Sequence, residues 1–317
     1  MGKTTCAAST ALNLAESGLR ILIVSLDPAH NLGDVLALSL GDKPKEVARN
    51  LHAMEVDMEG MVKSYLSGMT DMVRHMYRYL TVLNLDKFID ILRYSPGIEE
   101  YATLEAISDV LLNNRDFEVI VFDTPPTGLT LRVLALPLIS LMWVERLIDI
   151  RKRILGLRAA IENIKGERVL EIEGYKERLP SREEDPVMKE LKKYKRELEE
   201  VKETITNPGL TSVAAVLNPE SLPLWETERA FETLKKFKIP LKIFIVNKVL
   251  QIEEPPPELK AKLREQAEVL QRVEERFQGY PIVHSPMQGE EIRGVERLKG
   301  FPCPASAFFM EHLKVAA

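Results

Sequence analysis

The stretch from Phe117 to Arg132 constrains the fold of this chain more than any other part of the sequence. It begins with a short, mostly apolar run, Phe117–Phe122, which ends at Asp123 and is soon followed by two prolines. Such a run predicts a buried parallel strand. Open α/β sheets bind ligands at the carboxyl ends of their strands, where Asp123 would lie. The segment Leu129–Val144 is then apolar with a helical period, so one loop joins a candidate magnesium-facing carboxylate to the most hydrophobic segment.

The composition favours a globular protein with a large core. The chain has 317 residues, of which 45% are hydrophobic and 29% charged. This length allows one α/β domain with a substantial insertion. The net charge of −5 and the absence of a block of basic residues argue against a nucleic-acid partner.

The two cysteines and the first residues point to the cytoplasm. Cys6 and Cys303 lie far apart in the sequence, which predicts no disulfide framework and fits a reducing compartment. No secretory signal is visible, because the N-terminus leads directly into a polar threonine pair. The apolar run Leu129–Val144 is interrupted by Arg132 and Pro137 and is expected to be too short to span a bilayer. We therefore expect a soluble, cytoplasmic protein.

Gly2, Lys3, Thr4 and Thr5 match the second half of a phosphate-binding loop. In such a loop Lys3 reaches the β- and γ-phosphates and the Thr4 hydroxyl binds Mg²⁺. Backbone N–H groups at the start of a helix expected over Thr4–Ser17 would also hold the phosphates. A Gly-Lys-Thr triplet alone is common, so its position before a helix and the motifs downstream carry the interpretation.

The glycines and the apolar strand that precede Gly2 in a complete phosphate loop are missing from this sequence. The loop would then lack several amide donors, and the sheet would have a gap at its centre. We expect that the true start of the natural chain lies upstream.

A second apolar run, Leu19–Asp27, also ends at an acid, followed by Pro28, His30 and Asn31. An aspartate beside bound phosphates can position an attacking water. His30 and Asn31 could sense the γ-phosphate, or could form local hydrogen bonds only.

Methionines recur at helical spacing between Met58 and Met76, which predicts an amphipathic helix. The stripe could be ordinary core or a surface for varied apolar partners. The overall pattern predicts an α/β fold with a doubly wound, mostly parallel sheet and a helical subdomain. The single domain, 1–317, would have a nucleotide-binding core of about 1–57, 113–128 and 209–317, with helical insertions at about 58–112 and 129–208.

The motifs at Lys3, Asp27 and Asp123 occur in order, and together the sequence resembles the arsenite pump-driving and tail-anchored-protein-targeting ATPases of the deviant Walker A P-loop class. The resemblance covers nearly the whole chain. It rests on the segments Asp27–Asn31, Asp123–Arg132, Glu226–Arg229, Val246–Asn247 and Pro286–Gly294.

The resemblance implies a homodimer or higher homo-oligomer that binds ATP and Mg²⁺. Asp27 would position the hydrolytic water, Thr4 would bind the metal directly, and Asp123 would support it from its outer coordination sphere. The switch residues would be Pro28, His30, Asn31, Thr124, Pro125, Pro126, Thr127 and Gly128. The nucleoside would face Glu220, Asn247, Pro286 and Met287. A groove for apolar client segments would involve Met61, Met69, Met72, Met76, Leu134, Leu138 and Met142.

Departures from the family pattern narrow this prediction. The segment Gln251–Leu270 lacks the CxxC pair of zinc-binding members, so no zinc is expected. No cysteine lies between Cys6 and Cys303, which argues against thiolate-bound metalloid and against an iron–sulfur cluster. The resemblance implies an ATP-hydrolysing factor that binds transmembrane segments of tail-anchored proteins and contacts the membrane peripherally during delivery. An arsenite-pump ATPase and a nucleotide-gated interaction protein without turnover remain alternatives.

Overall fold

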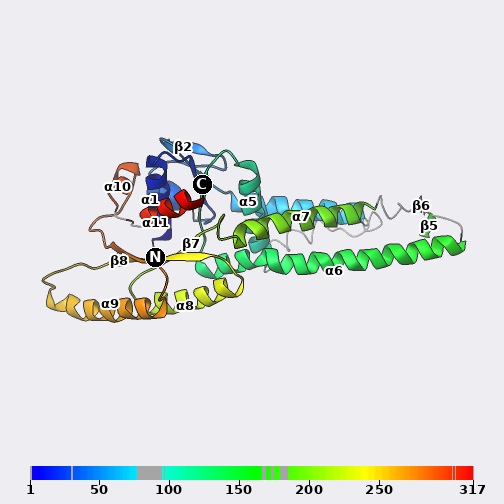
Figure 1. The fold of residues 1–317 in the computed structure, drawn as a ribbon. Coiled ribbons are helices and arrows are strands. Elements are labelled where there is room, and N and C mark those ends of the chain that lie inside the picture. The colour runs from blue at the N-terminus through cyan, green and yellow to red at the C-terminus, as the bar shows by residue number, and fades with distance from the viewer. Residues whose placement is uncertain are drawn as a thin grey trace.

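The structure is a computed structural model that describes residues 2–29, 31–76, 95, 97–165, 169–172, 175–178, 185–301, 303 and 305–316. Its strands form two separate parallel-containing sheets and one small hairpin, surrounded by helices (Figure 1). This mixed α/β architecture confirms the predicted fold class.

The first sheet has the strand order β2 (Lys45–Ala48), β3 (Leu51–Glu55), β1 (Ile21–Ser25) and β4 (Val119–Asp123). Strand β1 pairs in parallel with both β3 and β4, whereas β2 is antiparallel to β3. All five residues of β1 are buried. This position between two strands explains why β1 is a continuous apolar run rather than an alternating one.

The second sheet has the order β7 (Val213–Leu217), β8 (Leu241–Val249) and β9 (Ile282–Pro286), all parallel. Strands β4 and β7 are edge strands, and among the described strands no backbone ladder joins the two sheets. The first four residues of each are only half-buried. Both strands contribute to one hydrophobic core. This division agrees with the gap that the sequence predicts at the centre of the sheet.

Helices cover both faces of the second sheet, and successive side chains of β8 pack alternately against the helices on one face and on the other. Phe244 points to one face, where it stacks on Phe277 with a centroid distance of 3.9 Å. Ile243 and Ile245 pack on the other face with Cys6. The first face carries α8 (Ser221–Lys236) and α9 (Pro257–Arg276). The other carries α1 (Lys3–Glu16) and α11 (Ala305–Ala316), while α2 (Asn31–Leu36) and α10 (Val295–Lys299) pack beside α1.

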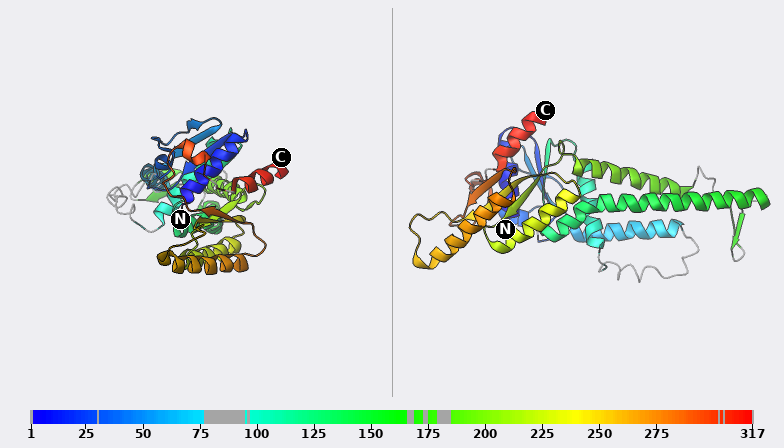
Figure 2. Two further views of the ribbon diagram at one scale, coloured as in Figure 1. Left: turned by 90° about the vertical axis from the view of Figure 1, so that its left-hand side faces the viewer. Right: turned by 60° about the horizontal axis from the view of Figure 1, so that its bottom comes forward.

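The remaining helices form an arm that extends away from the sheets (Figures 1 and 2). They are α3 (Met58–Met76), α5 (Ile98–Asn113), α6 (Thr127–Lys165) and α7 (Pro186–Thr206), with the hairpin β5 (Val169–Ile172) and β6 (Tyr175–Arg178) near the tip. The sequence predicts neither this hairpin nor one continuous helix over 127–165. Helix α6 has 39 residues and runs through Pro137, so it is about 58 Å long.

One helix among the described residues is long and apolar enough to cross a membrane, namely the Thr127–Ala160 part of α6. The expectation of a run too short for a bilayer rested on the segment Leu129–Val144, which turns out to be less than half of the helix. About a third of the most apolar window is buried inside the protein. Length and composition alone are weak evidence, because the core helix of a soluble protein meets the same criteria.

Candidate functional site

Three acids gather at the carboxyl ends of the first sheet. Ser25, the last residue of β1, pairs in register with Glu55 on β3 and with Asp123 on β4. Asp27 follows two residues after Ser25. The parallel register therefore brings together carboxylates that are up to 96 positions apart in the sequence, from Asp27 to Asp123.

Gly2 lies where only a glycine fits well. Its φ angle is +84°, and an added β-carbon would collide with the side-chain amide of Asn247. Gly2 caps α1, and its carbonyl accepts a hydrogen bond of 3.0 Å from the N–H of Cys6. This close approach places the start of α1 against the end of β8 and leaves the first N–H groups of the helix available to an anion.

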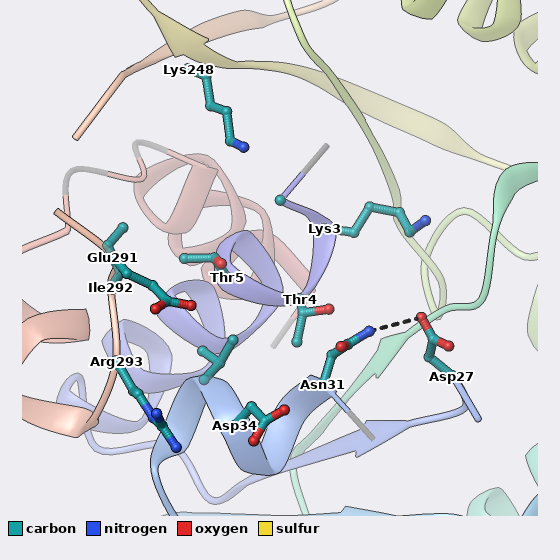
Figure 3. Close-up of a pocket in the computed structure, with 12 residues that line it drawn as sticks. Lys3, Thr4, Thr5, Asp27, Asn31, Asp34, Lys248, Glu291, Ile292 and Arg293 are labelled. Atoms are coloured by element: carbon teal, nitrogen blue, oxygen red, sulfur yellow. Dashed lines mark hydrogen bonds between the residues drawn. The ribbon is translucent and has the colours of Figure 1, made fainter. Parts of the chain in front are cut away.

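An open cleft of about 660 Å³ surrounds the start of α1 (Figure 3). Residues from both sheets and from the segment before α10 line it. Figure 3 shows Lys248 at the top of the cleft, Asp27 at its lower right, and Glu291 and Arg293 on its left side. The lining residues are Gly2, Lys3, Thr4, Thr5, Asp27, Asn31, Asp34, Val35, Lys248, Glu291, Ile292 and Arg293.

The Asp27 carboxylate is held by its own loop. Its Oδ1 accepts a hydrogen bond of 3.1 Å from the N–H of Ala29, and its Oδ2 accepts one of 3.4 Å from Nδ2 of Asn31 (Figure 3). These bonds fix the orientation of the carboxylate at the edge of the cleft. A carboxylate fixed in this way could orient a water molecule for attack on a bound phosphate.

Asp123 is buried, with 2% of its surface exposed. Burial raises the pKa of Asp123 to about 6, against a hydrogen bond from the Thr4 hydroxyl that lowers it. The negative charges of Asp27 and Glu55 raise this pKa further, whereas the positive charge of Lys3 lowers it. These effects place Thr4, Lys3, Asp27 and Glu55 within electrostatic reach of Asp123.

The Oδ2 atom of Asp123 is buried and has no hydrogen-bond partner within the described part of the chain. An unpaired carboxylate oxygen in such a place is costly unless a cation or water satisfies it. The nearby donors are hydroxyl and carboxylate oxygens, which are the ligands that Mg²⁺ prefers. The oxygen donors of Thr4 and Asp123 therefore fit a magnesium ion, which these two residues would hold.

The residues predicted to face the nucleoside lie at the carboxyl ends of the second sheet, outside the lining of the cleft. Glu220 precedes α8 and is exposed, Asn247 contacts Gly2, Pro286 is the last residue of β9, and Met287 follows it. Met287 is 55% exposed. The five residues predicted to bind phosphate or position water all line the cleft, namely Gly2, Lys3, Thr4, Thr5 and Asp27. The predicted switch residue His30 lies outside the described residues.

The predicted switch loop after Asp123 is short, and hydrogen bonds connect it to the loop of Asp27 and to the first turn of α6. The carbonyl of Asp123 accepts a hydrogen bond of 2.9 Å from the N–H of Leu26, which joins it to the loop of Asp27. The Thr130 hydroxyl donates a hydrogen bond of 2.8 Å to the carbonyl of Pro125. Pro125 is buried, and Thr124, Pro126, Thr127 and Gly128 are half-buried or exposed, with α6 starting at Thr127.

The residues predicted to form a client groove do not share one environment. Met61 and Leu134 pack against the main hydrophobic core, and Leu138 is half-buried. Met142 is 73% exposed. Met69, Met72 and Met76 belong to α3, but their side chains lie outside what the structure describes.

The sequence analysis misses several residues that the structure brings to the site. Lys248 and Arg293 add two cations to the cleft, and Asp34 adds an acid. Glu55 accepts a buried hydrogen bond of 2.8 Å from the N–H of Gly33 and so holds the first turn of α2. The position of Lys248 directly after Asn247 was the only sequence signal available for it.

Comparison with known proteins agrees with this geometry. Residues 1–303 match the model of a family described as anion-transporting ATPase. A protein of Aquifex aeolicus (strain VF5), provisionally named arsenical pump-driving ATPase 2, is 32% identical over 95% of this chain and 94% of its own length. ATPase GET3A of Arabidopsis thaliana is 32% identical over 95% of this chain and 79% of its own length. An ATPase ASNA1 homolog of Entamoeba dispar is 28% identical over 95% of this chain and 89% of its own length. The chain belongs to the anion-transporting ATPase family.

Proposed function

We propose that this protein is a nucleotide-switched ATPase that binds hydrophobic transmembrane segments of tail-anchored proteins for delivery to a membrane. The observation that carries the proposal is the continuity from Asp123 to α6. The candidate metal site, the loop that follows it and an exposed apolar helix are consecutive parts of one chain segment. A change at the nucleotide can therefore reach the helix directly.

At the cleft, Lys3 and the first N–H groups of α1 bind the β- and γ-phosphates of ATP, and Lys248 adds a positive charge. Thr4 would bind Mg²⁺ directly and Asp123 would support it from its outer coordination sphere, and the bound ion would supply positive charge beside the phosphates. Asp27 positions the attacking water. Asn31 holds the Asp27 carboxylate in place through the bond between Nδ2 and Oδ2.

The client-binding part is the exposed apolar face of α6. Its side chains recur every three or four residues along the arm, and their exposed fractions range from 37% to 73%. A monomeric soluble protein rarely exposes so long an apolar stripe. A transmembrane helix matches it in length and chemistry, because a bilayer-spanning helix has about 20 apolar residues. The stripe comprises Ile139, Met142, Trp143, Leu147, Ile150, Ile154 and Leu157.

Conformational change passes from the cleft to the arm through the first turns of α6. The Arg132 guanidinium lies 2.7 Å from the carboxylate of Glu100 on α5, which ties α6 to a second helix of the arm. A homodimer that closes around ATP would place two such arms side by side. The dimer is part of the proposal and follows from the family resemblance.

The test uses a photo-crosslinking transmembrane peptide and the purified full chain in detergent-free buffer with ATP and Mg²⁺. We expect crosslinks to α6, and we expect Trp143→Glu with Leu147→Glu to abolish them. Arg153→Ser, on an exposed position of the same helix, is the matched control and should crosslink normally. Equal crosslinking of both variants would overturn the client assignment.

The arsenite-pump alternative is favoured by the name of the Aquifex relative. It predicts that trivalent arsenite stimulates ATP hydrolysis, whereas the targeting function predicts no such effect. The third alternative, a nucleotide-gated interaction protein, predicts nucleotide binding without phosphate release. Both outcomes are read in the same hydrolysis assay with and without arsenite.

A further inference from the structure

The two cysteines of the chain, Cys6 and Cys303, are brought together by the fold although they lie near opposite ends of the sequence. Cys6 is in the second turn of α1, and Cys303 lies two residues before α11. The Cys303 sulfur lies 3.9 Å from the hydroxyl of Thr10, which is one turn after Cys6 on α1. Both cysteines belong to one small hydrophobic cluster with Ile243 and Ile245 of β8, so the contact is part of the packed interior.

We infer that Cys6 and Cys303 form a redox-active dithiol, which a peroxide oxidises to an intramolecular disulfide between α1 and the segment before α11. The inference is independent of the proposed function. It rests on the packing of both thiols in one small buried cluster, with Cys303 against Thr10 on the turn of α1 that follows Cys6, because a disulfide needs two sulfur atoms that lie close together.

The surroundings distinguish the roles of the two thiols. The Thr10 hydroxyl lies 3.9 Å from the Cys303 sulfur. Hydrogen bonds from the Cys6 side chain, the backbone N–H of Ala305 and Thr10 hold the pKa of the Cys303 thiol below its usual range, against the effect of burial. Cys303 is therefore the better nucleophile of the pair.

The chemistry balances with hydrogen peroxide as the oxidant. The Cys303 thiolate attacks one peroxide oxygen, the O–O bond breaks, and a sulfenic acid forms with release of one water. The Cys6 sulfur then attacks the Cys303 sulfur, and the sulfenic hydroxyl leaves as a second water with the Cys6 proton. The two thiols lose two electrons and two protons, and the peroxide is reduced to two water molecules.

Burial determines which reagents can react. Cys6 is 1% and Cys303 4% exposed, so the folded protein should exclude bulky thiol reagents, and the oxidant has to be as small as peroxide. The resulting bond would reinforce an existing link, since Nδ2 of Asn13 on α1 already donates a hydrogen bond of 3.3 Å to Ser306 on α11. Oxidation would therefore restrain α11 against the helix that carries Lys3 and Thr4.

The experiment treats the reduced, folded full chain with hydrogen peroxide and measures its intact mass and disulfide map. We expect the loss of two hydrogens, a Cys6–Cys303 crosslinked peptide and a Tm higher by about 5 °C, all reversed by dithiothreitol. Thr10→Ala should slow oxidation several-fold, whereas Thr10→Ser, which keeps the hydroxyl, should not. Cys6→Ser should instead leave a sulfenic acid on Cys303 that dimedone traps.

Two results would overturn the inference. One is a folded protein that keeps both thiols in peroxide while the same protein in urea forms the disulfide. The other is a crosslink between two chains, visible as a dimer on a non-reducing gel, without the intramolecular product.

Discussion

Thr4, in the first turn of α1, lies close enough to Asp123 at the end of β4 to lower the pKa of its carboxyl group. The Oδ2 atom of Asp123 has no partner among the residues that the structure describes. The site thus carries a buried charge that a bound cation would stabilise.

Asp123→Asn should raise the stability of the nucleotide-free protein at neutral pH. The folded-state pKa of Asp123, about 6, lies above its ordinary value of 3.8, so the folded protein binds the proton more tightly than the unfolded chain. The stability contribution of this group is present at low pH and is lost as the pH rises through 6. Removing the charge should therefore add about 2 to 3 kcal/mol at pH 7.5.

The measurement is urea unfolding of wild type and Asp123→Asn at pH 7.5 and pH 4.5. We expect a large difference at the higher pH and a small one at the lower. The variant should also lose ATP hydrolysis. A variant less stable than wild type at pH 7.5 would contradict the prediction.

Breaking the ion pair between Arg151 of α6 and Asp185 should loosen the arm. Arg151 donates hydrogen bonds of 3.0 Å and 2.6 Å to Asp185, which is fully buried and also accepts one of 2.8 Å from the N–H of Met188. Asp185→Ala leaves a mostly buried guanidinium without its partner, which costs about 3 to 5 kcal/mol. Hydrogen exchange of α7 measures the loss, and Asp149→Ala, an exposed acid on α6, is the control.

The same ion pair should respond to acid. Burial alone would raise the pKa of Asp185, but the hydrogen bonds from Arg151 and from the Met188 N–H outweigh it and hold this pKa below its usual range. The stabilisation is therefore complete above the ordinary pKa of 3.8 and is lost as the pH falls through the lower, folded-state value. If hydrogen exchange of α7 near neutral pH is the same in Asp185→Ala as in wild type, the ion pair does not stabilise the arm.

Lys248→Gly should weaken ATP binding about tenfold, or about 1.4 kcal/mol, because it removes a positive charge that lines the cleft. Glycine suits this position, since Lys248 has a φ angle of +59° and the change relieves rather than adds backbone strain. Lys242→Ala, on the same strand but outside the lining, should bind ATP normally. Titration with a fluorescent ATP analogue measures both, and equal affinities would remove Lys248 from the site.

Adding an apolar strand followed by Lys-Gly-Gly to the N-terminus should tighten nucleotide binding. The added strand can pair with the free edges of β4 and β7, and the added glycines supply N–H groups that bind phosphate. Hydrogen exchange should show new protection in both strands. The same extension with prolines in the strand is the control, because proline cannot donate ladder hydrogen bonds, and protection in both proteins would contradict the pairing.

The sequence alone determined which parts of the chain form the sheet and where its chemistry lies. Apolar runs such as Leu19–Asp27 and Phe117–Phe122 are local signals of buried strands, and an acid at the end of each marks the carboxyl edge. The helix after Lys3 was also predictable, since its pattern depends on residues three or four apart. These features are set by short-range sterics and burial, which a linear sequence records.

Which distant residues meet depends on the tertiary structure. The contact of Cys6 with Cys303, the collision that keeps Gly2 a glycine beside Asn247, and the place of Lys248 in the cleft all join residues more than 240 positions apart. Helix α6 continues past Val144 as one helix because α7 packs along it and buries residues such as Ile148 and Leu155. Such outcomes depend on the packing of whole elements against each other, and no local pattern encodes them.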